Sequence, residues 1–150
     1  MNESPEILDF PFQGQYSDLS RHDVRVLILY LLYVLNINDY EASLNSIVDA
    51  IKVGFDFYIP KDSYVFETAQ RISENREALD KKIEPLLKNW KIERLGLCTR
   101  LILQIALWEL ENSDTHPNII INEAIELAKE FSEKDAYKFV NGILDQLQKK

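Results

Sequence analysis

The stretch IIINEAIELAKEFSEKDAYKFVNGILDQL, residues 119–147, decides the fold of this chain. Two series of apolar residues run through it at spacings of three and four, the pattern of an α-helix with one buried face. They are Ile120, Ile121, Ala124, Leu127, Ala128 and Phe131, followed by Phe139, Val140, Ile143, Leu144 and Leu147. The stretch therefore predicts two short helices joined by a tight turn.

Two features of this hairpin make local predictions. Ser132 and Asp135 have the spacing of a capping box, in which each side chain accepts a hydrogen bond from the other's backbone N–H. We therefore expect the second helix to begin directly after Ser132. Gly142 lies within the second apolar series, where glycine costs about 1 kcal/mol relative to alanine. Its presence predicts that another element or a ligand approaches the backbone closely there.

The remaining apolar patterns predict further helices, and the scarcity of breakers, four glycines and five prolines, favours an all-α chain. A first helix is expected over residues 21–36, and a second after an Asn38–Glu41 capping pattern. A long third helix is expected over residues 63–88, with Pro85 kinking or ending it. A fourth helix ending near residue 110 is apolar almost all round, which predicts a central position.

Composition indicates one globular domain. The 150 residues are 46% hydrophobic and 28% charged, enough for a substantial core. The single cysteine, Cys98, excludes an internal disulfide and suits a reducing compartment. No signal peptide and no apolar run of about 18 residues are visible. We therefore expect a soluble cytoplasmic protein that does not enter a membrane.

The first twenty residues differ from the rest. They contain four acidic side chains, no basic one, two prolines and a glycine. This composition predicts an extended, mostly disordered acidic arm over residues 1–20, preceding a folded domain over residues 21–150. Phe10, Phe12 and Tyr16 are the arm residues that could dock on that domain.

Enzymatic chemistry has little support. The two histidines, His22 and His116, are not at a metal-binding spacing, and no glycine-rich phosphate loop is present. Cys98 lies in an apolar helix without an evident histidine partner, as expected of a core residue. We expect no catalytic residue, no metal and no cofactor.

Several segments carry more than periodicity. The runs NEAIELAK at 122–129 and KFVNGILD at 138–145 closely resemble the C-terminal signature of NusB transcription antitermination factors. The run RLILQIALWEL at 100–110 and Pro117 are similar to the helix and proline that precede it. The resemblance is specific over residues 95–147, looser over 21–87, and absent from the first twenty. It implies an all-α NusB-like helical bundle of about seven helices in two packed subdomains.

The resemblance implies RNA contacts in two places. The first is the start of the first helix, where the family carries an arginine-rich run that binds boxA leader RNA; here Arg21, His22 and Arg25 keep part of that character, and Asp23 weakens it. The second place is the hairpin. Its candidates are Asp135, Lys138, Phe139 and Asn141. Each has an ordinary alternative, namely surface charge, a cap, core packing or an internal hydrogen bond.

The resemblance also implies a protein-binding face. NusB proteins pair with NusE, a small-subunit ribosomal protein, and the pair binds boxA better than either partner alone. Tyr33 matches a family tyrosine, and Thr99 and Arg100 open the central helix near that face. Gln104 stands where many members have arginine. The net charge of −8 is unfavourable for RNA but suits a basic partner.

Together these features predict an antitermination factor that, with NusE, holds boxA RNA against a transcribing RNA polymerase during rRNA synthesis. One alternative is an accessory module of an rRNA methyltransferase. Another is a protein-interaction module with little RNA affinity. A homodimer through the arginine face stays open, as does an acidic arm that folds over that face and weakens RNA binding.

Overall fold

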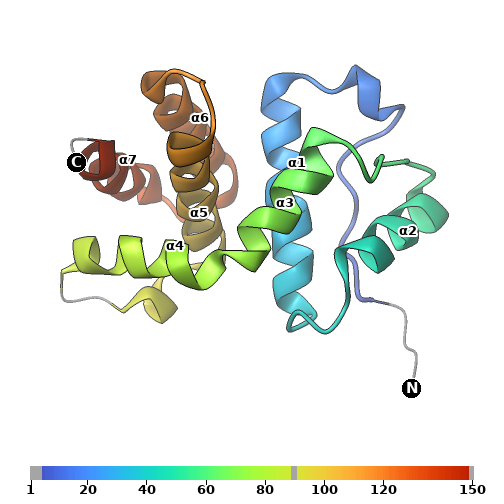
Figure 1. The fold of residues 1–150 in the computed structure, drawn as a ribbon, viewed down its shortest axis with the longest axis horizontal. Coiled ribbons are helices and arrows are strands. Elements are labelled where there is room, and N and C mark those ends of the chain that lie inside the picture. Colours follow the sequence, from blue (N-terminus) through green and yellow to red (C-terminus); the bar gives the residue numbers. More distant parts are fainter. Residues whose placement is uncertain (1–4, 89–90, 149–150) are drawn as a thin grey trace. The chain divides into compact units, whose positions relative to one another are not determined.

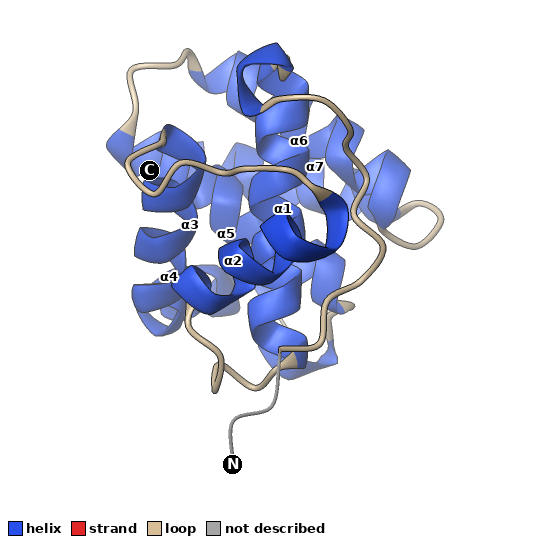
Figure 2. Ribbon diagram, turned by 90° about the vertical axis from the view of Figure 1, so that its right-hand side faces the viewer, coloured by secondary structure: helices blue, strands red, loops and turns tan. Residues whose placement is uncertain are grey.

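The computed structural model describes residues 5–88 and 91–148, and within these ranges every regular element is a helix (Figure 2). Seven α-helices and three short 3-10 helices occur in them, which confirms the all-α class and the expected number of helices. The chain divides into two compact units, Met1–Ser73 and Glu74–Lys150, called unit 1 and unit 2 below. No helix in the described ranges is long and apolar enough to cross a bilayer.

Unit 1 is built on α1 (Arg21–Ile37), which packs against α2 (Leu44–Phe55). These helices are light blue and green-blue in Figure 1. The apolar side chains of α1 account for its depth in the fold: Leu27, Ile28, Leu31 and Val34 have no exposed surface. The first predicted helix is therefore confirmed, and it is a core element.

Helix α2 begins later than the Asn38–Glu41 pattern predicts. Its N-cap is Ser43, whose Oγ accepts a hydrogen bond from the Ser46 N–H at 3.1 Å. Asn38 instead caps the C-terminus of α1, where its side-chain amide donates to the Val34 carbonyl at 2.8 Å. Asparagine bonds backbone groups at either end of a helix, so the local pattern does not decide between the two roles.

The long helix predicted over residues 63–88 is wrong. The structure has α3 (Tyr64–Glu74), α4 (Arg76–Ile83) and the 3-10 helix η2 (Glu84–Leu87) in that range. The break falls at Asn75, with φ −107° and ψ 13°, next to the boundary between the two units. The apolar spacing stays helical on both sides of the break, and only the burial of each piece in a different unit separates them. Helix α4 ends two residues before Pro85, as proline favours.

Unit 2 is organised around α5 (Leu97–Asn112), which follows the 3-10 helix η3 (Ile92–Arg94). Helix α5 contacts α4, α6 (Pro117–Phe131) and α7 (Ala136–Gln148), and Figure 1 shows α5 and α6 side by side. Five of its apolar residues are at most 2% exposed: Leu101, Ile102, Leu103, Ile105 and Ala106. The prediction of a central, nearly all-apolar helix holds within unit 2.

The α6–α7 hairpin is confirmed, with two corrections. Phe131 is 42% exposed rather than buried, because it is the last residue of α6, one turn beyond Leu127. Helix α7 begins at Ala136 and not directly after Ser132, which is the C-cap of α6. Asp135 has φ +69°, a left-handed conformation that a capping-box acid inside the first helical turn does not adopt. The predicted capping box is therefore wrong.

The acidic arm differs from the mostly disordered segment expected. Residues 5–20 are extended apart from the 3-10 helix η1 (Tyr16–Asp18), and they pack against the rest of unit 1. Glu6 and Asn38 exchange two hydrogen bonds, of 2.9 and 2.7 Å. The ring of Phe10 lies 4.9 to 5.8 Å from those of Phe12, Tyr30, Phe55 and Phe57. The arm is low in hydrophobic residues overall, but its few aromatic side chains anchor it. Composition alone does not show that these rings come together in a cluster.

The link between the arm and α1 predicts a dependence on alkaline pH. The Tyr30 hydroxyl donates to the Leu8 carbonyl at 2.5 Å. Burial, and to a lesser extent the Asp9 carboxylate, raise the pKa of Tyr30 from 10.0 to about 12. As pH rises, the unfolded chain releases this proton first. The stability that the neutral phenol contributes is therefore complete below about pH 10 and is lost between about pH 10 and 12.

We expect Tyr30→Phe, which cannot ionise, to lose less unfolding free energy than the wild type between about pH 9 and pH 11. Urea denaturation at both pH values measures the loss of unfolding free energy for each protein. Because the variant lacks the Tyr30 hydrogen bond at both pH values, that bond does not contribute to the loss measured for the variant. Equal losses in Tyr30→Phe and the wild type would contradict the prediction.

Candidate nucleic-acid interface

The start of α1 is held by a reciprocal cap. The Asp23 N–H donates to Ser20 Oγ at 3.0 Å, and the Ser20 N–H donates to Asp23 Oδ2 at 3.3 Å. Asp23, the acid that weakens the arginine-rich character of this segment, thus caps the start of the helix, and its negative charge complements the helix dipole. Its negative charge has a structural role here that the sequence pattern did not reveal.

The three candidate residues at this end of α1 differ in exposure. Arg21 is exposed and His22 is half-buried, whereas Arg25 is only 8% exposed. Arg21 and Arg25 lie one helical turn apart, as expected, but burial withdraws the Arg25 side chain from solvent. Of the three, Arg21 is the side chain most accessible to a phosphate.

The start of α7 carries a small basic and aromatic cluster. The Nζ atom of Lys138 lies 5.9 Å from the centroid of the Tyr137 ring and 3.8 Å from Asp135 Oδ1. Lys129, from α6, places its Nζ atom 5.1 Å from the same ring. Both lysines are exposed, and Tyr137 is half-buried. Proteins bind single-stranded RNA through lysine side chains, which contact phosphates, and through aromatic rings, which stack on bases.

A pocket of about 250 Å³ lies beside this cluster, within unit 2. Its lining is Arg94, Leu95, Gly96, Thr99, Glu133, Ala136 and Phe139. Phe139 is half-buried and Arg94 is exposed, so the pocket joins an aromatic surface to a cation that sequence reasoning did not select. Nothing in the local sequence links Arg94 to Phe139, since they are 45 positions apart and only the packing of α7 near the start of α5 brings them to one pocket.

Asn141 and Gly142 lie on the exposed side of α7. A Cβ atom built on Gly142 would meet no atom of the described structure within 4 Å. The predicted close approach of another element of this chain is therefore wrong for the described residues. The alternative, approach by a ligand, stays a prediction.

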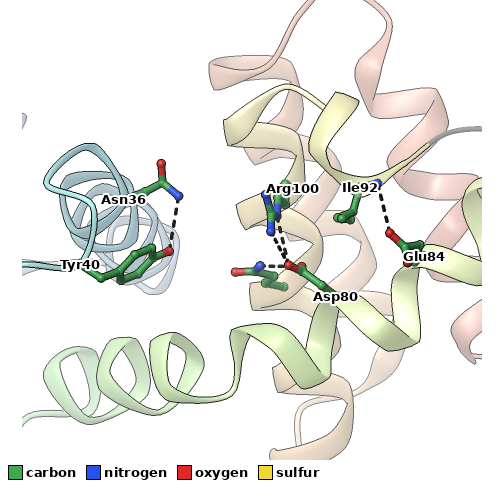
Figure 3. Close-up of polar contacts among 7 residues, drawn as sticks. Asn36, Tyr40, Asp80, Glu84, Ile92 and Arg100 are labelled. Atoms are coloured by element: carbon green, nitrogen blue, oxygen red, sulfur yellow. Dashed lines mark hydrogen bonds and ion pairs between the residues drawn. The ribbon is translucent and has the colours of Figure 1, made fainter.

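Two of the three candidates for a protein-binding face have partners inside unit 2. Thr99 is 4% exposed, and its hydroxyl donates to Ser132 Oγ at 3.1 Å. Arg100 forms an ion pair with Asp80, with its Nη2 atom 2.5 Å and its Nε atom 3.2 Å from Oδ2 (Figure 3). The third candidate, Tyr33, is half-buried on α1.

Gln104 completes the cluster around Asp80. Its Nε2 atom donates to Asp80 Oδ1 at 2.7 Å, so both carboxylate oxygens accept from α5. Gln104 is 3% exposed. The position where many NusB proteins have arginine therefore holds a neutral donor here, and the cluster combines one cation with one anion.

Cys98 is half-buried near the pocket. Burial, and then the nearby Glu133 carboxylate, raise the pKa of its thiol. A thiol with a raised pKa is a poor nucleophile at neutral pH, which agrees with a packing role.

Comparison with known proteins decides the family. Residues 22–149 match the NusB family. The chain belongs to the NusB family. The transcription antitermination protein NusB of Staphylococcus carnosus is 37% identical over 129 residues, which cover 86% of this chain and 99% of that protein. The NusB relative of Staphylococcus haemolyticus is 36% identical over 135 residues, covering 87% of this chain and 100% of that protein.

The solved NusB structure from T. maritima superimposes with a TM-score of 0.75 at 29% identity, over 88% of this chain and 92% of that one. The likeness confirms the helical NusB architecture that the signature predicted. The NusB family match begins at residue 22, so the whole acidic arm precedes it. The arm thus lies outside the NusB match, whereas its partners Tyr30, Asn38 and Phe57 lie inside it.

Proposed function

We propose that this chain is a cytoplasmic transcription antitermination factor that binds boxA leader RNA together with NusE, in the complex formed with RNA polymerase. Membership in the NusB family, whose curated relatives are named transcription antitermination proteins, is the observation that carries the proposal. The mechanism is binding: cationic side chains neutralise phosphates, and aromatic rings stack on unpaired bases.

The charge distribution supports RNA contact on unit 2. Unit 1 has five Lys and Arg against eleven Asp and Glu, a net charge of −6, whereas unit 2 has twelve against fourteen, a net charge of −2. Most basic side chains of this acidic protein are therefore in unit 2, as phosphate contacts require. On α7, Phe139 lines the pocket together with Arg94, and Lys138 lies 5.9 Å from the Tyr137 ring, so both kinds of contact are available.

In the proposed complex, Phe139 stacks on a base at the pocket and Arg94 and Lys138 contact phosphate. Asp135 and Asn141 are exposed, so they are available to base edges. Arg21 supplies a phosphate contact from unit 1, and His22 and Arg25 support it. Tyr33, Thr99 and Arg100 remain the proposed NusE face, with Thr99 and Arg100 acting mainly by shaping the start of α5.

The test is fluorescence anisotropy of a labelled boxA RNA, titrated with the protein alone and with NusE. We expect Phe139→Leu, which keeps an apolar side chain but removes the π face, to weaken binding about tenfold, since stacking contributes about 1–3 kcal/mol per base. Arg94→Gln should weaken binding and reduce the slope of log K against log salt by about 1.

Lys61→Gln is the matched control, because Lys61 is exposed and paired with Asp49 in unit 1. It should leave the affinity and the slope unchanged. Unaltered affinity in both Phe139→Leu and Arg94→Gln would contradict the RNA contact at the pocket. NusE association without RNA affinity under any condition would instead favour the protein-interaction module.

A further inference from the structure

A second pocket, of about 500 Å³, lies in unit 1 between the arm and the loop that follows α2. The arm contributes Gly14, Gln15, Tyr16 and Ser17, and the loop contributes Asp56, Tyr58 and Pro60. The four arm residues precede residue 22, where the NusB match begins. The formation of this pocket therefore depends on a segment outside the NusB match.

The walls of this arm pocket are aromatic. Tyr16 is half-buried, and its hydroxyl accepts a hydrogen bond from the Val65 N–H at 3.4 Å, which ties the arm wall to the start of α3. Tyr58 is 55% exposed on the loop side. Lys52 holds its Nζ atom 5.3 Å from the centroid of the Tyr58 ring, so that ring already attracts one cation. Aromatic faces of this kind bind guanidinium and ammonium groups.

The charge of the pocket lining itself is negative. Asp56 is the charged residue of the lining, and an Asp18 carboxylate oxygen lies 3.4 Å from where a Cβ atom on Gly14 would be. Unit 1 as a whole carries a net charge of −6. Lys61, the basic residue next to Pro60, is paired with Asp49 at 3.2 Å. The pocket therefore complements a cation, and its negative surroundings repel a nucleic-acid phosphate.

We propose that this arm pocket binds an arginine side chain of a basic partner protein. The planar guanidinium stacks on Tyr58 and Tyr16 and donates to the Asp56 carboxylate, a combination that arginine makes better than lysine. The surrounding acidic surface of unit 1 attracts the basic segment that carries this arginine. The inference rests on unit 1 alone and stands whether or not the RNA contacts of unit 2 are correct.

The experiment titrates the full-length protein with an arginine-rich nonapeptide and with the same peptide carrying glutamine in place of arginine. Two-dimensional ¹H–¹⁵N NMR follows the backbone signals. We expect the arginine peptide to shift the signals of residues 14–17 and 56–59, and the glutamine peptide to leave them in place. A lysine version of the peptide should bind more weakly than the arginine version.

Three variants separate the pocket from general electrostatic attraction. Asp56→Asn removes the carboxylate and keeps the backbone, since asparagine tolerates the left-handed conformation of Asp56, φ +54°. Tyr58→Leu removes the aromatic wall. Asp62→Asn, an exposed acid outside the pocket lining, removes the same charge nearby. We expect about tenfold weaker peptide binding for the first two and less than about a twofold change for the third.

Equal weakening by Asp56→Asn and Asp62→Asn would overturn the proposal, because the peptide would then respond only to net charge. So would an absence of shifts at residues 14–17 and 56–59 with the arginine peptide. The RNA titration of Phe139→Leu is unaffected by either outcome, so failure of this inference and failure of the proposed function are distinguishable.

Discussion

Replacing Asp80 by alanine should lower the free energy of unfolding by about 3 kcal/mol, the low end of the cost of removing one partner from a buried ion pair, because the Arg100 side chain is partly exposed. Asp80 is 9% exposed and accepts hydrogen bonds from Arg100 and Gln104 of α5. Without the carboxylate, the buried Gln104 amide loses its acceptor and the Arg100 guanidinium loses its ion pair with Asp80. Urea denaturation followed by tryptophan fluorescence measures the effect, since both tryptophans belong to unit 2.

The matched control for Asp80→Ala is Glu111→Ala, which removes an exposed ion pair of α4 and α5, Lys82–Glu111 at 2.5 Å. Exposed pairs contribute less than about 1 kcal/mol, so this variant should stay close to the wild type. The double variant Asp80→Leu/Arg100→Leu should recover part of the loss, because it removes both charges, while the buried Gln104 amide still lacks the acceptor that Asp80 supplied. A loss under about 1 kcal/mol in Asp80→Ala would show that the cluster is not a stabilising element.

Replacing Phe10 by alanine should lower the free energy of unfolding of unit 1 by about 2–3 kcal/mol. A fully buried phenylalanine loses about 3–5 kcal/mol, and Phe10 is half-buried. Its ring contacts four others, the nearest being Phe57 at 4.9 Å between centroids. The loss of these contacts also weakens the attachment of the arm, which keeps its hydrogen bonds to Tyr30 and Asn38. Hydrogen exchange of α1 and α2 amides measures the change within unit 1.

Leu8→Ala is the control for the arm, since Leu8 is 41% exposed two positions away and its backbone carbonyl, which accepts from Tyr30, is retained. We expect a change below about 1 kcal/mol. If Phe10→Ala left the exchange rates of α1 and α2 unaltered, the aromatic cluster would not stabilise unit 1. The disordered arm predicted from composition would then describe residues 5–20 better than the docked arm of the structure does.

The boundaries of the helices show where local pattern suffices. Apolar spacing predicted α1, α5, α6 and α7 because a helical period repeats within a few residues and needs no distant partner. The same spacing continued through Asn75, so the split into α3 and α4 was not visible. Ser132 and Asn38 matched start signals but ended helices, because serine and asparagine serve both purposes.

At the candidate site, the sequence likewise predicted some residues, and only the folded structure revealed others. The signature over residues 95–147 was enough to predict the NusB family, which the match over residues 22–149 confirmed. It also selected Lys138 and Phe139 on α7. It did not select Arg94 or Lys129, which reach Phe139 and Tyr137 from other helices. Nor did it show that Arg25 is buried while Arg21 is exposed.

By itself, the sequence determined the helical class, most helices and the family, since these depend on residue types at short, regular spacings. Only the tertiary structure decided the break at Asn75, the docking of the arm through Phe10, the Asp80 cluster and the two pockets. Each of these depends on side chains that are distant along the chain and come together through packing. Contacts of that kind follow from the burial of whole helix faces and leave no periodic trace in the sequence.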